Sequence, residues 1–484
     1  MNNPPFILSL QDKRQKNKYF LFLIQYIRNT MTSISKNPFK DKKLSTLLLK
    51  FSAPAVAGMF VNALYNIISR IYVGQDMGAD GLAGITILFP LGLIYMGFSA
   101  LIGVGTNALF SIRLGEKRRL EAHRILGNGF TLLTLVCTAL TVVSYALLDP
   151  FLALLGADAQ IMPYARGYAE VVLPGYLLFG IGAGMNHFIR SSGHPKTAMA
   201  TQFIGAFINL VLGPIFIFLF HWGIRGAAAA TVCGQLISFM WVMYFFLSGR
   251  SVYRLRLKYC RLKQHIVLGS LAIGFSQFAF QLASGLLNIV LNHALLRYGG
   301  NLAISAVGIA ISVNTLIIMP LLGISQGAQP LIGYNHGARK FTTAIHTLKM
   351  AMRWGVFITT AGFILIEIFA VQVASVFNAQ DTALITLSAR VLRIFNLLLP
   401  IIPLQIMATS FFQAINQPLK AAFLSLSRQV LLVLPLVLIL PLFFGLDGIF
   451  LAPPVADAVS TLLSVYLLQR FFTKHGQTLW FKRK

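Results

Sequence analysis

The feature that most constrains the fold is the recurrence of long apolar runs along all 484 residues. A helix needs about 20 mostly apolar residues to cross the hydrocarbon core of a bilayer. Only 11% of the residues are charged, whereas a soluble chain carries about 25%. Helices are the spanning structures that satisfy their own backbone in lipid over runs of this length. We therefore predict an all-α integral membrane protein.

Twelve apolar runs are long enough to span the membrane. They are expected at 47–72, 82–112, 124–147, 161–189, 197–220, 225–247, 266–296, 302–335, 343–371, 384–413, 419–443 and 448–470. The runs divide the chain into a basic tail, a six-helix lobe, a linker, a second six-helix lobe and a second basic tail: 1–44, 45–247, 248–265, 266–472 and 473–484.

The two halves carry the signature of an internal duplication. Gly105–Gly115 and Gly327–Gly337 share two glycines and a leucine at an offset of 222 residues, and the same offset relates Gly223 to Gly445. Several matches at one offset indicate a repeated unit. Since each half has an even number of spans, both enter the membrane in the same sense. We expect a pseudo-twofold axis along the membrane normal, an arrangement suited to alternating access around a shared cavity.

The charges indicate the orientation. Lys and Arg concentrate in both tails and in alternate connectors, among them 113–124 and 250–263, while Asp76, Asp149 and Asp447 lie in the opposite set. The positive-inside rule places both termini in the cytoplasm of a plasma-membrane protein. The net charge of +27 is spread over short loops, which argues against nucleic acid as a partner. We expect a monomer surrounded by membrane lipid.

Uncharged polar residues form helical stripes within the spans. Spacings of three and four residues put side chains on one helix face. Interhelical hydrogen bonds, worth about 0.6 kcal/mol each, would explain any single one of them. Two stripes on the first helices of the two lobes favour a polar cavity between the lobes for substrate and ion. Its candidate residues are Asn62, Tyr65, Asn66, Ser69, Asn209, Gln277, Gln281, Ser284, Asn288, Gln326 and Gln329.

Three acidic residues fall inside predicted spans, where a carboxylate is costly and suggests function. Asp457 is the deepest and is the candidate for coupling transport to an ion; the alternative is a structural carboxylate bonded to a neighbouring helix. Glu170 follows Arg166 at (i, i+4), which predicts a local ion pair. Glu367 is expected at the membrane interface.

Other kinds of chemistry lack their sequence patterns. The nine histidines and three cysteines form no HExxH, HxxxH or CxxC motif, so we predict no metal site, no cofactor and no enzymatic activity. No phosphate-binding GxxxxGK[ST] loop is present, so any uphill transport must use an ion gradient.

Several segments resemble one transporter family. They are Asn62–Gly74 (NALYNIISRIYVG), Arg190–Lys196 (RSSGHPK), Asn209–Phe216, Gly226–Thr231 and Gln326–Ala338. They are similar to multidrug and toxic compound extrusion (MATE) transporters over about 45–472. The resemblance implies a twelve-helix, two-lobed antiporter. It implies export of organic cations and other amphipathic drugs in exchange for protons or sodium.

The chain departs from the family at the usual coupling acids. The resemblance implies Asp at two positions where this chain has Ser69 and Gly213, and an acid found in some members falls at Ser284. Three alternatives follow: Asp457 takes over the role, coupling differs, or coupling is weak. A lipid-linked precursor flippase with the same two-lobe plan and a polytopic membrane enzyme are the competing functions. Both Met1 and Met31 are possible starts.

Overall fold

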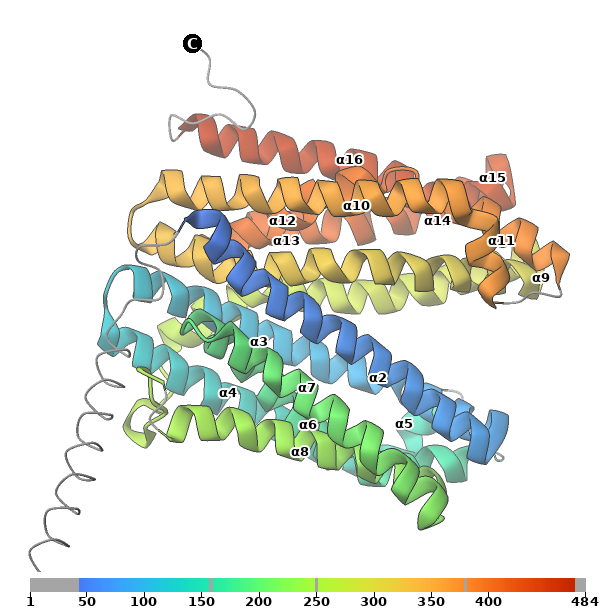
Figure 1. Ribbon diagram of the computed structural model, residues 1–484, viewed down its shortest axis with the longest axis horizontal. Coiled ribbons are helices and arrows are strands. Elements are labelled where there is room, and N and C mark those ends of the chain that lie inside the picture. The colour runs from blue at the N-terminus through green and yellow to red at the C-terminus, as the bar shows by residue number, and fades with distance from the viewer. Residues whose placement is uncertain (1–42, 156–158, 160, 249–250, 378–380, 475–484) are drawn as a thin grey trace, which may run out of the picture. The chain divides into compact units, whose positions relative to one another are not determined.

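The computed structural model describes residues 43–155, 159, 161–248, 251–377 and 381–474 (Figure 1). Every regular element in these ranges is a helix. The two basic tails predicted at 1–44 and 473–484 lie almost wholly outside the described residues.

Six of the candidate membrane spans among the described residues belong to the first lobe, whose helices are shown in Figure 1. Its elements are α2 (Leu44–Ile87), α3 (Phe89–Gly115), α4 (Arg119–Ala146), the short α5 (Leu148–Leu154), α6 (Met162–Ser191), α7 (Pro195–Pro214), the π-helix η1 (Ile215–Leu219) and α8 (Gly223–Leu247). A short 3-10 turn, η2 (Leu257–Tyr259), follows in the linker.

The second lobe repeats the pattern. Its elements are α9 (Gln264–Gly337), α10 (Phe341–Phe377), α11 (Thr382–Phe395), η3 (Leu399–Ile401), α12 (Ile402–Ala414), α13 (Pro418–Leu426), the π-helix η4 (Ser427–Val433), α14 (Leu434–Ile439), α15 (Pro441–Phe444) and α16 (Leu446–Lys474). In the described part of the chain, eleven helical stretches are long and apolar enough to cross a membrane.

The 74-residue α9 accounts for the twelfth span. A straight helix of that length would measure about 110 Å, far beyond the roughly 30 Å of a bilayer core. Gly300, with φ 63° and ψ −162°, breaks it into two crossings. The predicted twelve-helix, two-lobed membrane fold is therefore confirmed.

Two helices differ from the expected boundaries. α2 continues through 73–81, which the sequence suggested as a connector. The tenth span, expected to be continuous over 384–413, is interrupted between α11 and α12. Pro400 lies in this interruption and Pro403 in the first turn of α12, and proline removes a backbone donor and clashes with the preceding turn. The Nδ2 of Asn314 donates to the Oδ1 of Asn396 at 2.7 Å beside the break.

The duplication is visible in the backbone. Lys117 and Arg339, 222 residues apart, both have a φ of 60° just after α3 and α9. Gly223 and Gly445, at the same offset, have φ values of 54° and 56°. Left-handed residues are uncommon, so their repetition at one offset shows that each lobe turns its helices in the same way.

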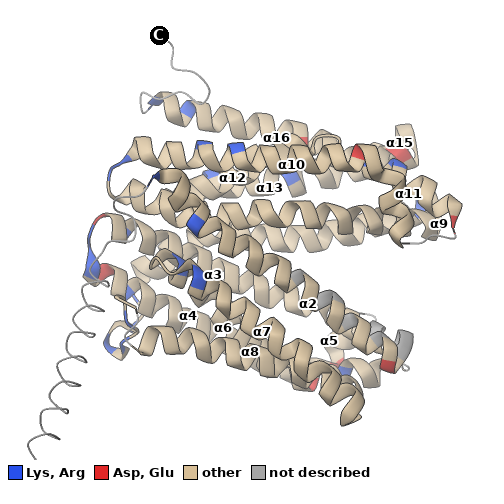
Figure 2. Cartoon of the chain, viewed as in Figure 1, with Lys and Arg blue, Asp and Glu red and all other residues tan. Residues whose placement is uncertain are grey.

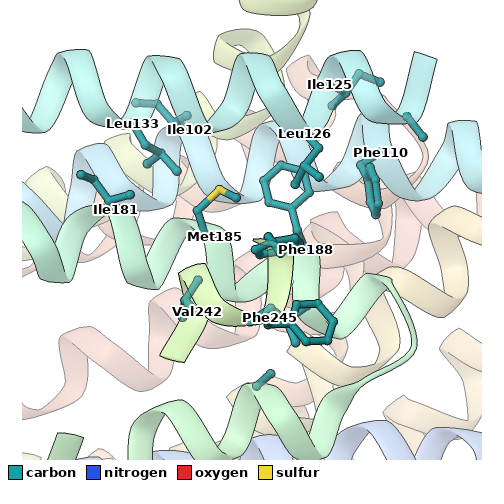
Figure 3. Close-up of a cluster of buried hydrophobic side chains, with 14 of the residues drawn as sticks. Ile102, Phe110, Ile125, Leu126, Leu133, Ile181, Met185, Phe188, Val242 and Phe245 are labelled. Atoms are coloured by element: carbon teal, nitrogen blue, oxygen red, sulfur yellow. The ribbon is translucent and has the colours of Figure 1, made fainter. Parts of the chain in front are cut away.

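An apolar core holds α6 against α3, α4 and α8 in the first lobe (Figure 3). Phe110 and Phe188 meet edge to face, with ring centroids 5.2 Å apart, and Met185 and Leu126 are fully buried beside them. Such packing resists movement of single side chains. It fixes which face of α6 is left for polar residues.

The lobes meet backbone to backbone through glycines, which we call the interface glycines: Gly105, Gly274 and Gly327. A Cβ on Gly105 would lie 2.8 Å from the carbonyl carbon of Ser270 and 3.0 Å from the nitrogen of Gly274. A Cβ on Gly327 would lie 2.7 Å from the Cα of Ser52. Ser52 and Gly274 are themselves 222 residues apart, so the two contacts are pseudosymmetric copies.

Lys and Arg gather at the end of the helices where α3 and α9 finish, which we call the basic end (Figure 2). The opposite end, which we call the far end, holds α5 and the junction of α15 and α16 (Figure 2). Asp149 of α5 and Asp447 in the first turn of α16 are each paired there with an arginine. The interface glycines of α3 and the second half of α9 lie towards the basic end, so the lobes are closest there.

Candidate functional site

A cavity of about 380 Å³ lies between the lobes. Its walls come from α2, α3, α6, α7 and α8 of the first lobe and from α9 and α12 of the second. Val104 and Gln326 line it, each next to an interface glycine. The tight contact of α2 and α3 with α9 therefore forms the wall of the cavity that faces the basic end.

The structure brings many of the predicted site residues together in this cavity. Its lining includes Asn62, Tyr65, Asn209, Gln277, Gln281, Gln326 and Gln329. Other candidates lie outside the described lining: Ser69, Ser284, Asn288 and Asp457. Asn66 belongs to α2, but its side chain lies outside the described residues.

The cavity wall of the second lobe is a glutamine network. Gln413 of α12 accepts hydrogen bonds on Oε1 from the Nε2 of Gln329 at 3.3 Å and of Gln277 at 3.5 Å. Its own Nε2 donates to the hydroxyl of Ser276 at 2.9 Å. Gln413 thus joins the polar stripes of both halves of α9, although the sequence stripes did not include it.

The first lobe contributes a polar face of α8 that the sequence reading missed. Thr231, Gln235 and Ser238 line the cavity at intervals of four and three residues, the spacing of one helix face. The Nδ2 of Asn209 donates to the Oγ1 of Thr231 at 2.9 Å, and Ser238 donates to the carbonyl of Thr201 at 2.9 Å. These bonds tie α8 to α7.

Arg190 lines the cavity, although it falls just outside the predicted fourth span. The fourth span was expected to end at residue 189, but Arg190 lies in the last turn of α6 and is 6% exposed. Its Nε and Nη2 donate to the Oδ1 of Asn186 at 3.3 and 2.9 Å. Its Nη1 donates to the Oε1 of Gln326 in the other lobe. Asn186, His187 and Arg190 share a helix face, and this spacing is the sequence pattern that could have predicted a polar face on α6.

Asp457 lies in α16 with 3% of its side chain exposed and accepts a bond of 2.5 Å from the Nε of Arg428 in η4. The next residue, Gln429, donates from Nε2 to the hydroxyl of Ser284 at 3.1 Å. Ser284 belongs to the same stripe of α9 as Gln281, which lines the cavity. The residue that follows Arg428 in the chain is therefore hydrogen-bonded to a stripe that reaches the cavity wall.

The remaining acids inside spans, Glu170 and Glu367, are partly exposed and paired with arginines. The predicted pair of Arg166 and Glu170 is confirmed at 3.0 Å, and Arg225 also contacts Glu170 at 3.3 Å. Glu367 lies 3.9 Å from Arg393, both partly exposed. Among the described residues, no group of three His, Cys, Asp or Glu is placed to hold a metal ion.

A sequence model of one family, MatE, matches residues 54–215 and 272–439, once in each lobe. The chain belongs to the MatE family. Its two matched segments fall on the two halves of the duplication. Gly213, where the family resemblance implied an acid, packs against Tyr72: a Cβ there would lie 3.2 Å from the ring. In this MatE protein an aromatic ring therefore contacts the position expected for a carboxylate.

Curated relatives and solved structures agree with the family. The "Multidrug export protein MepA" of Staphylococcus aureus (strain MRSA252) is 24% identical over 441 residues, covering 89% of this chain and 95% of that protein. A MATE structure in the bent conformation has a TM-score of 0.84 at 24% identity, covering 90% of this chain and 97% of that one.

A structure from Pyrococcus furiosus Vc1 has a TM-score of 0.82 at 25% identity, covering 89% of this chain and 96% of that one. It is described as a MOP superfamily transporter whose binding pocket has reverse polarity, suggesting a different function.

Proposed function

We propose that the protein is a secondary active exporter of amphipathic small molecules, driven by a proton or sodium gradient. The observation that carries the proposal is the polar cavity between two pseudosymmetric lobes, closed at the basic end by interface glycines. The MepA relatives, named as multidrug export proteins, support export as the direction of transport.

The geometry supports alternating access. Opening the cavity at the basic end requires the lobes to separate at the interface glycines. It also requires the hydrogen bond between Arg190 and Gln326, which crosses from one lobe to the other, to break. The glutamine network around Gln413 lies within the second lobe and can move with it as a unit.

We propose that the basic end faces the cytoplasm, in line with the positive-inside rule. The described state is then the one closed to the cytoplasm. A cysteine introduced at Lys340, which is exposed at that end, should react with a membrane-impermeant thiol reagent only after the membrane is permeabilised. Labelling of this cysteine in intact cells would show that the basic end faces outwards and contradict the proposed orientation.

We keep Asp457 as the proposed coupling carboxylate, because it is the one Asp or Glu among the described residues that is buried. Proton binding, or replacement of Arg428 by a sodium ion, would break the ion pair. The change would reach the cavity through Gln429 and Ser284. The polar stripes of α2, α7 and α9 are the proposed walls of the transport path.

The test is gradient-driven flux in proteoliposomes loaded with fluorescent amphiphiles of different charge. Transport under a proton gradient alone or a sodium gradient alone would establish an antiporter and identify its ion. Movement of a lipid-linked head group without any free amphiphile would replace the proposal with a flippase. A covalently altered product would replace it with a membrane enzyme.

A further inference from the structure

The charge of the cavity points to a particular class of substrate. Among the described lining residues, Arg190 is the one with a permanent formal charge, and none is Asp or Glu. The other polar groups are hydroxyls, amides and the imidazole of His187. The described walls therefore present a net positive charge.

The bonds of Arg190 orient it without neutralising it. Both of its protein acceptors, Asn186 and Gln326, are neutral amides. The three donated bonds use one N–H each on Nε, Nη1 and Nη2, and a guanidinium has five N–H groups. A buried cation without a counterion is unfavourable, so an anion entering the cavity gains a partner that the protein does not supply.

The walls around this charge are apolar and aromatic. Phe179, Phe239, Phe280, Met59 and Leu322 line the same cavity. A volume of about 380 Å³ falls in the range of small-molecule sites, which combine apolar walls with a few fixed polar groups. The arrangement suits a molecule with one anionic head group and an apolar body.

We propose that this cavity binds amphipathic organic anions, with Arg190 holding a carboxylate or sulfonate head group against the apolar walls. Arginine is suited to this role because its planar donors match the two oxygens of a carboxylate. The inference rests on the proposed export function and assigns its substrate class. It differs from the export of organic cations that the family resemblance implied.

The first experiment compares head groups on the purified full-length protein by calorimetry. The probes are 2-naphthylacetate, the matched naphthylethylammonium ion, the neutral naphthylethanol, and acetate without the ring. We expect 2-naphthylacetate to bind at least about tenfold more tightly than the ammonium ion and acetate, the size of one charge-assisted contact. If the ammonium ion binds as tightly as the anion, the proposal is overturned, and this test uses the wild-type protein alone.

The second experiment removes the charge. Arg190→Gln should weaken binding of 2-naphthylacetate about tenfold or more and leave naphthylethanol nearly unchanged, whereas Arg190→Lys should retain most of the anion affinity. Arg353→Gln is the matched control, because Arg353 is exposed on α10 and does not line the cavity. Equal loss for the anion and the alcohol would reduce Arg190 to a structural residue and overturn the proposal.

Flux measurements separate the two proposals. Movement of the ammonium ion rather than the anion under a gradient would leave the exporter standing and remove the anion site. Tight, Arg190-dependent binding of the anion with no flux of any probe would leave the site standing and remove the exporter. Gradient-driven flux of the anion that falls in Arg190→Gln supports both.

Discussion

Substituting Gly105 by alanine should open the basic end. The new Cβ would lie 2.8 Å from the Ser270 carbonyl carbon, whereas carbon atoms pack at about 3.5–4.0 Å. The neighbouring atoms belong to backbone, so no side chain can rotate away. Relief of the overlap therefore requires α3 and α9 to move apart by about 1 Å.

The energetic cost follows from that movement. Overpacking by one methyl group costs about 1–3 kcal/mol when the surroundings cannot adjust. A state in which the lobes have rocked apart avoids this cost. Gly105→Ala should then shift the population towards that state by about 5- to 150-fold.

Distances between spin labels test this prediction. Cysteines at Arg118 and Lys340, exposed in the two turns of the basic end, would report their separation in a background without the native cysteines. The matched control is Gly308→Ala in α9, where a Cβ would meet no heavy atom within 4 Å. The control should be neutral or more stable, since alanine is favoured in helices by about 0.5–1 kcal/mol. An unchanged distance distribution in Gly105→Ala would refute the reasoning.

Three further predictions follow from other contacts. Asp457→Asn should abolish gradient-driven flux while substrate binding persists, because the amide can still accept a bond from Arg428 but cannot ionise. Asn128→Ala should lower the free energy of unfolding by about 1–3 kcal/mol in a thermal or denaturant assay. The side-chain amide of Asn128 donates to the backbone carbonyls of Tyr259 and Arg261 at 3.3 and 3.1 Å. Its oxygen accepts from the backbone nitrogen of Lys263 at 2.7 Å. Burial lowers the pKa of His194 below its usual value of about 6.5, so folding favours the neutral ring. Its contribution to stability is complete above that pH and is lost as the pH falls towards the lowered value, and His194→Gln should flatten this dependence.

Each of these has a matched control. Glu367→Gln changes a partly exposed acid and should leave flux intact, while full flux in Asp457→Asn would exclude a coupling role. Asn288→Ala removes an exposed amide that bonds within its own helix and should cost little. His265→Gln, which removes an exposed histidine, is the matched control for His194→Gln. Equal acid sensitivity in His194→Gln and the wild type would contradict the assignment.

The spans could be predicted because hydrocarbon thickness sets a minimum apolar length, which is a property of composition alone. Breaks inside spans were harder to predict. Pro400 and Pro403 sit in a run that is apolar throughout, and prolines also occur inside intact helices here, as at Pro174 in α6. Which proline interrupts a helix depends on the neighbours that satisfy the freed backbone groups.

The cavity was only partly predictable for a related reason. Stripes on α2 and α9 could be recognised because their polar residues repeat at helical spacing. Arg190 was misassigned because an arginine at the end of an apolar run usually extends its charge to the interface. Here α6 continues past Arg190 to Ser191, and the chain turns at Gly193, which has a φ of 90°. Asn186 and Gln326 accept hydrogen bonds from the guanidinium and hold it at the cavity. Contacts between lobes are not encoded in any one helix.

The paired glycine contacts have a consequence for the dynamics of the molecule. Gly105 against Gly274 and Gly327 against Ser52 are pseudosymmetric copies on either side of the axis between two packed lobes. If the lobes rock apart at the basic end as rigid bodies, both contacts break in one event. We therefore expect a cooperative transition without a stable half-open intermediate, whose kinetics are single-exponential even though the interface is made of two separate parts.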